Sequence, residues 1–560
     1  MGSSKIGSKN LKKCFAAAAA EHTLETRFAR HSTPRTMKYK STRGGCPSVG
    51  FEAAICSGYA PDGGLYVPEQ IPTVSAAMLQ KWSTLPFAEL AVQVLALFVG
   101  DEIPAAYMRA ICAASFSQFT DPGVVPVVKV GALHVAELFH GPTLAFKDFG
   151  QQVLCKMLDF FAVRANRDIT LVVSTTGDTG PAAIRATAGS RRLRILCTYP
   201  TGQVSRLQEQ QMTTVDSPSV RVFTFEGGGD DMDGPIKRVT TDPAFTARHG
   251  LTSVNSINLG RVTVQTVHFF FSYFRTIEQV PGAQVGDEIT FCVPTGAMGN
   301  VTAGHMARLM GLPMAQLCSG VNANDIVHRA FSKGQFWKES MHRTLSEAIN
   351  IQVPYNFERL LFFICDFDSG TVAGLMAGLE ATGKLTLPPP TLRKLQTLFS
   401  SAVVSDDEMK DTVRQLKAAH GYLVDPHSAV GVACATKLGW RHDDAASVAR
   451  APGKAVLVLA TAHVCKFEHA MCEALGRDFW ESVELPESAR ALDSLPDVGG
   501  RPAGKVFLAG DKLDEVGVSL HAAAGGAWER QLRGLIDGSV EGGFGPPPPQ
   551  TWMHWLRSKL

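Results

Sequence analysis

The chain has 560 residues, of which 45% are hydrophobic and 19% are charged, a composition typical of globular proteins and a length that suggests roughly two to four domains. Its 54 basic and 52 acidic residues give a formal net charge of +2, which provides no basis for a nucleic-acid or membrane-surface partner. No apolar run approaches the ~18 residues of a membrane span. The sequence therefore predicts no nucleic acid and no membrane among the partners.

The 12 cysteines are scattered and form neither a C-x-x-C pair nor a cluster with histidines at zinc spacing. Several lie within apolar runs, such as Cys197 in LRILCTYP and Cys292 in ITFCVP. They are expected to be reduced thiols that pack as small apolar side chains. This use of cysteine favours a cytoplasmic location and predicts no metal site.

Residues 1–36 have a composition unlike the rest of the chain. They hold seven Lys or Arg residues, five consecutive alanines, and only Glu21 and Glu25 as acids. A basic leader that is poor in acids is typical of an organelle transit peptide. The alternative is a disordered extension ahead of Met37, and the sequence leaves both open.

Residues 37–125 are expected to form a mainly helical N-terminal region. PDGG at 61–64 is a turn signal, and helical patterns follow over about 75–98 and 103–117. From about residue 170, apolar runs typical of strands alternate with helical stretches, which predicts βαβ units and a mostly parallel, doubly wound α/β sheet with helices on both faces. The expected strands are 171–175, 193–199, 220–225, 288–293 and 315–321, and the expected helices are 203–213, 231–242, 260–278 and 300–311. Residues 481–560 form a C-terminal extension in which VGGRPAG and the prolines at 546–549 are linker-like.

Three segments carry candidate chemistry, and each has a simpler alternative. PTGAMGN at 294–300 follows a strand and precedes a helix, so its N–H groups could hold a phosphate, or it could be an ordinary turn. STTGDTG at 174–180 has the same setting and could hold a small carboxylate, or Asp178 or Thr179 could only cap the helix. Lys147 follows Leu144, Ala145 and Phe146, where its amine could be kept neutral for imine formation, or its stem could pack while its ammonium reaches water.

The motifs together resemble those of the threonine synthase family. HGPTLAFKD is similar to the cofactor-lysine motif, STTGDTG to the substrate loop T-S-G-D-T-G, PTGAMGN to the phosphate loop P-S-G-N-F-G-D, and LATAHVCKF at 459–467 to T-A-H-P-A-K-F. The resemblance covers roughly residues 37–480. LQEQQMTTV, DPHSAVGVA and Ala297 make it closest to the threonine synthase-like 2 branch.

This resemblance implies the fold and the domain boundaries. The fold would be pyridoxal-phosphate (PLP) fold type II, similar to the β-subunit of tryptophan synthase, with two mostly parallel sheet domains and the cofactor between them. The large, PLP-binding domain would comprise 126–150 and 245–480. The small domain, with the substrate loop, would comprise 151–244.

The resemblance also assigns roles to individual residues. Lys147 would form the Schiff base with PLP, Thr461 would face the pyridine nitrogen, and the cofactor phosphate would lie on Gly296, Ala297, Met298, Gly299 and Asn300. The substrate carboxylate would lie on Thr176, Gly177, Asp178 and Thr179, with Ser256, Asn258 and Arg261 as candidates for the substrate phosphate. The chain departs from the family pattern at Thr176, where Ser is usual, at Ala297 in place of Asn, and at Val464 and Cys465 in place of Pro and Ala.

The implied activity is that of a PLP-dependent carbon–oxygen lyase. O-phosphohomoserine, a small-molecule substrate, would react with water to give threonine and phosphate, in a monomer or homodimer. Two alternatives stay open. One is a phospho-lyase that converts O-phosphohomoserine or O-phosphothreonine to 2-oxobutyrate, ammonia and phosphate. The other is a PLP-binding regulatory protein of low activity.

Overall fold

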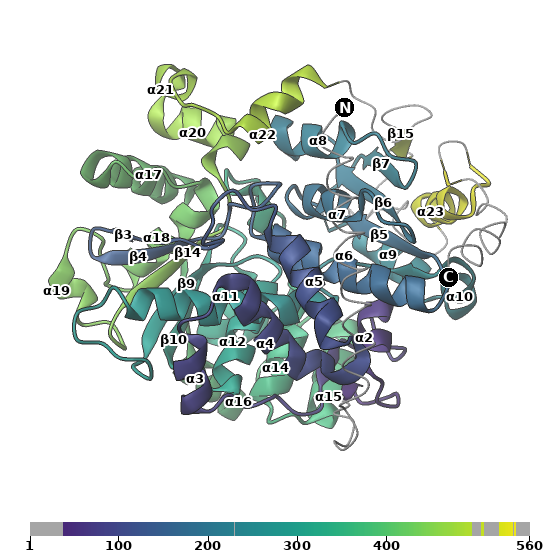
Figure 1. Cartoon of the computed structure of the whole chain (residues 1–560), viewed down its shortest axis with the longest axis horizontal. Coiled ribbons are helices and arrows are strands. Elements are labelled where there is room, and N and C mark those ends of the chain that lie inside the picture. Colours follow the sequence, from purple (N-terminus) through teal and green to yellow (C-terminus); the bar gives the residue numbers. More distant parts are fainter. Residues whose placement is uncertain (1–36, 229, 496–505, 509–525, 541–542, 545–560) are drawn as a thin grey trace.

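The computed structural model describes residues 37–228, 230–495, 506–508, 526–540 and 543–544 (Figure 1). The proposed leader at 1–36 and the proline run at 546–549 lie outside these residues. No helix within the described ranges is both long and apolar enough to cross a membrane.

A six-stranded sheet forms the left half of the molecule in Figure 1. All neighbouring strands are parallel except the edge pair β3–β4. The order across the sheet is β13 (Phe399–Val403), β10 (Met314–Val321), β9 (Ile289–Pro294), β14 (Val456–Ala460), β4 (Leu133–Glu137) and β3 (Val127–Val130).

A fully parallel five-stranded sheet lies on the right of the same view. Its order is β15 (Val506–Leu508), β7 (Val220–Phe225), β6 (Leu193–Pro200), β5 (Ile169–Ser174) and β8 (Leu251–Thr252). The five strands predicted from the sequence are β5, β6 and β7 of this sheet and β9 and β10 of the six-stranded sheet. Each is confirmed to within two residues at both ends. The chain passes from the first sheet to the second after β4 and returns after β8, so the two sheets are interleaved in sequence.

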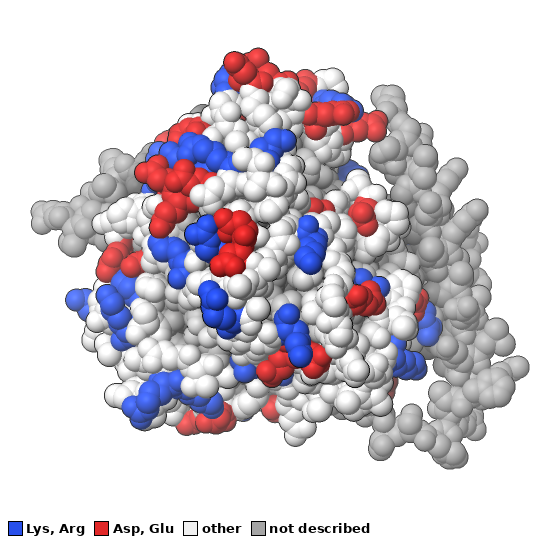
Figure 2. Space-filling view, turned by 90° about the vertical axis from the view of Figure 1, so that its left-hand side faces the viewer, with Lys and Arg blue, Asp and Glu red and all other residues white. Residues whose placement is uncertain are grey.

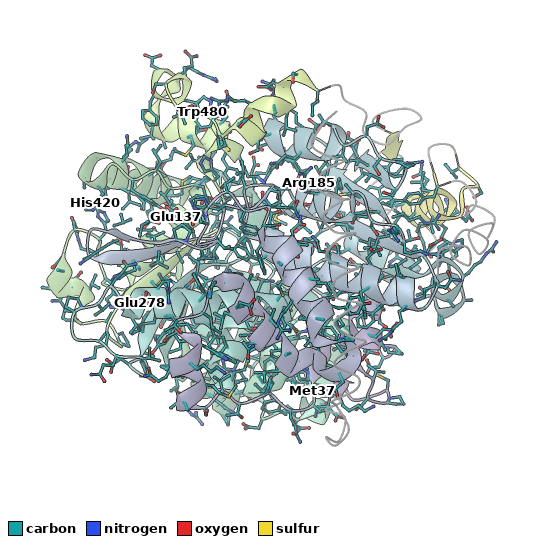
Figure 3. The ribbon with its side chains drawn as sticks, in the orientation of Figure 1. Met37, Glu137, Arg185, Glu278, His420 and Trp480 are labelled. Carbon is teal, nitrogen blue, oxygen red and sulfur yellow. The ribbon has the colours of Figure 1, made fainter. Side chains whose placement is uncertain are left out.

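Successive residues of the central strands face different cores, as expected for sheets covered on both faces. In β9, Phe291 and Val293 join a large core that also contains Leu171 and Val173 of β5. Cys292 of β9 faces a second core. Side chains fill the space between the ribbons (Figure 3), and the two sheets share one contiguous hydrophobic core.

Helices cover both sheets. The helices that surround the five-stranded sheet are α6 (Lys147–Arg164), α7 (Thr179–Thr187), α8 (Arg206–Thr213), α9 (Asp233–Thr241), α10 (Pro243–His249) and α23 (Ala527–Asp537). Those that follow in the part of the chain with the six-stranded sheet are α11 (Leu259–Ile277), α12 (Gly299–Met310), α13 (Ile326–Lys333), η2 (Glu347–Ile349), α14 (Asn356–Ile364), α15 (Ser369–Thr382), α16 (Pro389–Leu398), α17 (Asp406–His420), α18 (Pro426–Lys437), α19 (Ala445–Val448), η3 (Val464–Lys466), α20 (Glu468–Leu475), α21 (Arg477–Glu481), α22 (Glu487–Arg490) and η4 (Ala491–Ser494). A short pair, β11 (Gln335–Phe336) and β12 (Leu385–Thr386), lies among them.

The N-terminal region is mainly helical, as predicted. It contains β1 (Tyr39–Ser41), β2 (Tyr66–Pro68), α2 (Phe51–Ser57), α3 (Ala76–Trp82), α4 (Phe87–Val99), η1 (Gly100–Glu102) and α5 (Ala105–Phe116). The helical stretch predicted over about 75–98 is confirmed as helical, but it is two helices, because the chain breaks between α3 and α4. Pro86 stands at the N-cap of α4 with an extended backbone, and proline cannot continue a helix from the preceding turn.

The C-terminal extension contributes ordered structure that its composition did not predict. Strand β15 adds to the edge of β7, and α23 packs on α9. Trp528 of α23 is completely buried and meets the ring of Phe225 edge-on.

On the surface shown in Figure 2, basic and acidic residues are intermixed, so this face carries no broad patch of one charge.

Candidate functional site

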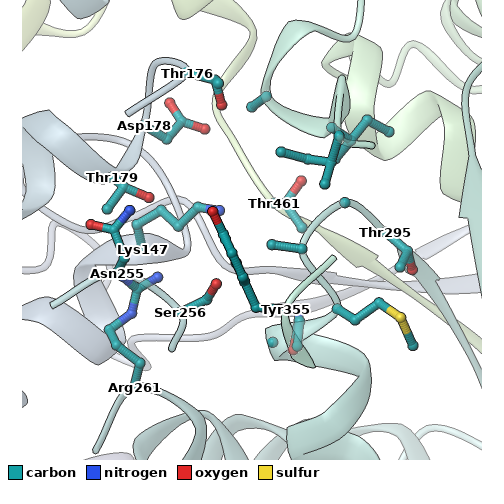
Figure 4. Close-up of a pocket in the computed structure, with 18 of the residues that line it drawn as sticks. Lys147, Thr176, Asp178, Thr179, Asn255, Ser256, Arg261, Thr295, Tyr355 and Thr461 are labelled. Atoms are coloured by element: carbon teal, nitrogen blue, oxygen red, sulfur yellow. The ribbon is translucent and has the colours of Figure 1, made fainter. Parts of the chain in front are cut away.

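One pocket gathers residues at the ends of three strands, at the start of α6, and on α11, η2 and α18 (Figure 4). Lys147 opens α6, residues 174–179 follow β5, residues 294–300 follow β9, and Thr461 follows β14. These strands belong to both sheets, and their carboxyl ends meet here. Ligands of doubly wound folds bind in this position, because the loops after the strands converge there.

Twelve of the fourteen predicted site residues line this pocket. They are Lys147, Thr176, Asp178, Thr179, Ser256, Arg261, Gly296, Ala297, Met298, Gly299, Asn300 and Thr461. Gly177 and Asn258 are not among the lining residues. The Gly177 N–H donates to Thr175 Oγ1, and the Asn258 side chain caps α11 and donates to the carbonyls of Ile55 and Ser253.

Lys147 projects into the pocket, with Nζ 4.3 Å from the centre of the Phe146 ring. No carboxylate pairs with it among the described residues. Burial and then the positive charge of Arg261 lower the pKa of Lys147 to about 8. Its amine is therefore neutral far more often near neutral pH than that of an ordinary lysine, as a nucleophilic lysine requires.

The loop at 294–300 leads into the N-terminus of α12. Met298 has a left-handed backbone (φ 61°), which turns the chain so that the first N–H groups of the helix are available to an anion. Both polar atoms of the Asn300 side chain are buried, and in the described part of the chain neither has a partner at hydrogen-bond geometry, although the His268 ring lies near. The Asn356 side chain donates to the carbonyls of Ala297 and Ser256, so it ties this loop to the segment at 255–261.

Asp178 in the loop after β5 is already paired. Its carboxylate contacts Lys466 Nζ at 2.8 Å and accepts from Gln208 Nε2 at 2.9 Å. Burial raises the pKa of Asp178, but the positive charge of Lys466 and its hydrogen bond to the carboxylate outweigh this and hold the pKa below its usual value. An ionised Asp178 cannot attract a second carboxylate, so a substrate carboxylate could be held only by N–H and hydroxyl groups of this loop.

Arg261 is a buried cation without an acidic partner in the described residues. Only 2% of it is exposed, its Nη1 donates to the Val254 carbonyl, and its Nε has no partner. Burial lowers the pKa of Arg261 to about 10. The guanidinium still carries its charge near neutral pH, so an unpaired cation beside Lys147 predicts an anionic ligand.

The backbone of Thr461 is fixed from both sides. Its N–H donates to Ser428 Oγ and its carbonyl accepts from the N–H of Phe146, both at 2.8 Å. Because Phe146 immediately precedes Lys147, the segment after β14 and the segment before α6 are held in register.

The sequence reasoning missed several other lining residues. Asn255 directly precedes the predicted Ser256, and His427 lies in DPHSAVGVA, so the sequence offered a signal for both. No motif in the sequence marks Asp230 or Asp233. Burial raises the pKa of both carboxyl groups, and the charge of Asp230 raises the pKa of Asp233 further. The missed residues are Phe146, Ser174, Thr175, Asp230, Asp233, Asn255, Gln265, Pro294, Thr295, Val301, Ala348, Ile349, Ile351, Tyr355 and His427.

Two family models match parts of this chain. Residues 38–116 match the family described as threonine synthase N terminus, and residues 428–498 match that described as threonine synthase, C-terminal. The chain is 43% identical over 399 residues to threonine synthase-like 2 of Rattus norvegicus, covering 71% of this chain and 82% of the relative. It is 36% identical over 442 residues to threonine synthase of Pseudomonas aeruginosa, covering 78% and 90%.

Among solved structures, a PLP-bound threonine synthase from Brucella melitensis superimposes with a TM-score of 0.75 at 36% identity, covering 84% of this chain and 96% of that one. The predicted fold, two mostly parallel α/β sheet domains of PLP fold type II with a mainly helical N-terminal region, is confirmed. The chain belongs to the threonine synthase family.

Proposed function

We propose that this protein is a PLP-dependent threonine synthase, which converts O-phosphohomoserine and water to threonine and phosphate. The main support for this proposal is the set of residues in one pocket. It combines a lysine whose pKa is lowered to about 8, an anion-binding helix N-terminus at 296–300, and the unpaired cation Arg261. A substrate with its own phosphate, acting beside a phosphorylated cofactor, needs two separate anion sites.

The residues present fit PLP. Lys147 offers a neutral amine to the aldehyde, the N–H groups at 296–300 suit the phosphate, and the unsatisfied Asn300 amide marks a place for a polar partner. Thr461 supplies a neutral hydroxyl for the pyridine nitrogen. When bound, PLP would supply an electron sink for negative charge at carbon.

The chain's own groups would then bind the substrate and move its protons. Arg261, with Ser256 and the newly recognised Asn255, would hold the substrate phosphate, and N–H groups at 176–179 would hold the carboxylate. Lys147 Nζ would remove the α-proton and then a β-proton, because its lowered pKa leaves it able to accept and return protons near neutral pH. Loss of phosphate and addition of water at the β-carbon give threonine.

The second candidate is a phospho-lyase on the same substrate. Its support is the resemblance, which associates the threonine synthase-like 2 branch with the lyase outcome; the chain is 43% identical to threonine synthase-like 2 and 36% identical to the bacterial threonine synthase. Both reactions share every step up to phosphate loss. The lyase releases the unsaturated product before water adds, and that product decays to 2-oxobutyrate and ammonia.

Product analysis separates the two candidates. The purified protein, loaded with PLP, is given O-phosphohomoserine, and phosphate, threonine and 2-oxobutyrate are measured together. Threonine equal to phosphate establishes the synthase, and 2-oxobutyrate equal to phosphate establishes the phospho-lyase. A protein that binds PLP but releases no phosphate would contradict both and favour a regulatory PLP-binding protein.

The lowered pKa of Lys147 has a consequence for cofactor loading. The rate at which the PLP-free protein forms its Schiff base should increase with pH, and the midpoint of this increase should lie near pH 8, because the neutral amine is the reacting form. Stopped-flow absorbance over pH 6–11 measures this rate. A midpoint near the 10.5 of an ordinary lysine would contradict the burial argument.

Arg261→Gln should weaken substrate binding more than cofactor binding. The loss of one charge-assisted contact to a phosphate raises KM by roughly tenfold or more, while the absorbance of bound PLP stays. Arg275→Gln is the matched control, because Arg275 lies on the same helix, α11, and pairs with Glu278 outside the pocket. Equal KM values for the two variants would remove Arg261 from the phosphate site.

A further inference from the structure

Asp425 is a buried carboxylate behind the pocket, and the residues that touch it reach the pocket on two sides. It is 1% exposed and stands at the N-cap of α18, where it accepts from the N–H groups of His427 and Ser428. A cap needs only these two bonds. Asp425 makes two more, to the side chains of the same residues.

Two series of contacts, here called arms, connect Asp425 with the pocket. The first arm runs through His427 to the loop at 294–300. His427 Nδ1 lies 2.9 Å from Asp425 Oδ1, and His427 Nε2 lies 3.0 Å from the Ala348 nitrogen. The backbone N–H of Ala348 can only donate, so Nε2 accepts and Nδ1 carries the proton that Asp425 accepts. Ala348 belongs to η2, where the Cα of Ile349 lies 3.1 Å from the position that a Cβ on Gly296 would occupy. The first arm therefore fixes the backbone that packs on the phosphate loop.

The second arm runs through Ser428 to the segment that carries Lys147. The Ser428 hydroxyl donates to Asp425 Oδ2, so its oxygen is left to accept the N–H of Thr461 at 2.8 Å. The Thr461 carbonyl in turn accepts the N–H of Phe146. The second arm therefore fixes the backbone of Thr461 and, through Phe146, the backbone from which the Lys147 side chain extends.

We propose that Asp425 is a positioning residue. Through His427 and Ser428 it fixes the position of the phosphate loop at 294–300 relative to Thr461 and Lys147 on the other side of the pocket. The inference rests on the proposed function only in assigning PLP to this pocket. His427 itself is not a free base in this arrangement, although it lines the pocket, because the Ala348 N–H occupies its one lone pair.

The arrangement requires a carboxylate rather than an amide. All four groups around Asp425 donate: two backbone N–H groups, the His427 ring N–H and the Ser428 hydroxyl. An asparagine has one accepting oxygen, so in either orientation its NH₂ faces donors on one side. If His427 exchanged its proton to accept from that NH₂, its Nε2–H would face the Ala348 N–H. Asp425→Asn should thus disturb an arm, although it keeps the size of the side chain.

The experiment compares Asp425→Asn with a matched cap variant, Asp368→Asn. Asp368 is the N-cap of α15, accepts from the Gly370 N–H and the Thr371 hydroxyl, and does not line the pocket. Asp425→Asn should bind PLP on the order of tenfold to a hundredfold more weakly, with a shifted absorption maximum of the Lys147-bound cofactor. Asp368→Asn should leave the PLP dissociation constant and the absorption spectrum unchanged.

Single-arm variants keep the proposal testable if Asp425→Asn does not fold. His427→Leu should weaken PLP binding, and His427→Gln should restore it in part, because the Gln oxygen can accept the Ala348 N–H. Ser428→Ala should shift the absorption spectrum. Wild-type PLP affinity and spectrum in Ser428→Ala and His427→Leu would overturn the proposal, as would an Asp425→Asn variant that loses only thermal stability. Because PLP binding and absorbance need no substrate, a wild type that binds PLP without turning over O-phosphohomoserine would refute the proposed function alone.

Discussion

Replacing Lys147 with alanine should abolish the absorbance of protein-bound PLP as a Schiff base and lower kcat with O-phosphohomoserine by roughly a thousandfold or more. The amine at this position forms the covalent link and carries the protons, and no other lysine lines the pocket among the described residues. The measurements are an absorption spectrum with added PLP, borohydride trapping followed by mass spectrometry, and phosphate release.

Lys156→Met is the matched control for this variant. Lys156 lies on the same helix, α6, and burial lowers its pKa to about 8 as well, but its Nζ donates to Gln152 and it does not line the pocket. Its replacement should leave the Schiff base in place. PLP trapped on Lys156, or a trapped Schiff base in Lys147→Ala, would contradict the assignment of Lys147, because a lysine outside the pocket would then react with the cofactor.

Lys466→Met should destabilise the protein by about 3–5 kcal/mol, because it leaves the buried carboxylate of Asp178 without its counter-ion. Lys466 is completely buried, contacts Asp178 at 2.8 Å and donates to the Thr143 carbonyl. Without the ammonium, burial dominates and the pKa of Asp178 should rise. Urea unfolding followed by circular dichroism measures the loss.

Two further variants define this effect. Lys466→Met combined with Asp178→Asn should recover part of the stability, because the uncompensated charge is gone. Lys437→Met removes the pair with Glu408, whose two side chains are 40% and 45% exposed, and should cost at most about 1 kcal/mol. Equal losses in Lys466→Met and Lys437→Met would mean that the Asp178 pair contributes no more than a surface ion pair.

The regular part of the fold was readable from sequence, because its strands are apolar on both faces and are separated by turns. The motif residues around Lys147 were readable because each motif holds its groups within a few positions. Lys466 was quoted within LATAHVCKF, but its partner Asp178 is nearly 300 residues away in sequence. Asp230 and Asp233, just before and at the start of α9, line the pocket beside a segment more than 100 residues later in the chain, whose Gln352 N–H donates to Asp230. Long-range pairing of this kind leaves no local pattern.

The C-terminal extension shows the same limit. Gly-rich and Pro-rich composition obscured a strand of three residues, Val506–Leu508, and a helix whose Trp528 fills a buried site. A three-residue strand is too short to show alternation, and it is stabilised by its partner β7 rather than by its own propensity.

The pairing of β15 with β7 also constrains how the chain folds. Val506 lies opposite Phe223, so the edge of the five-stranded sheet stays open until residues 506–508 have left the ribosome. During that time β7 exposes unpaired backbone groups, and Phe225 lacks the cover that Trp528 later provides. The protein should therefore depend on slow, non-local pairing late in synthesis, when an open edge can aggregate with other chains.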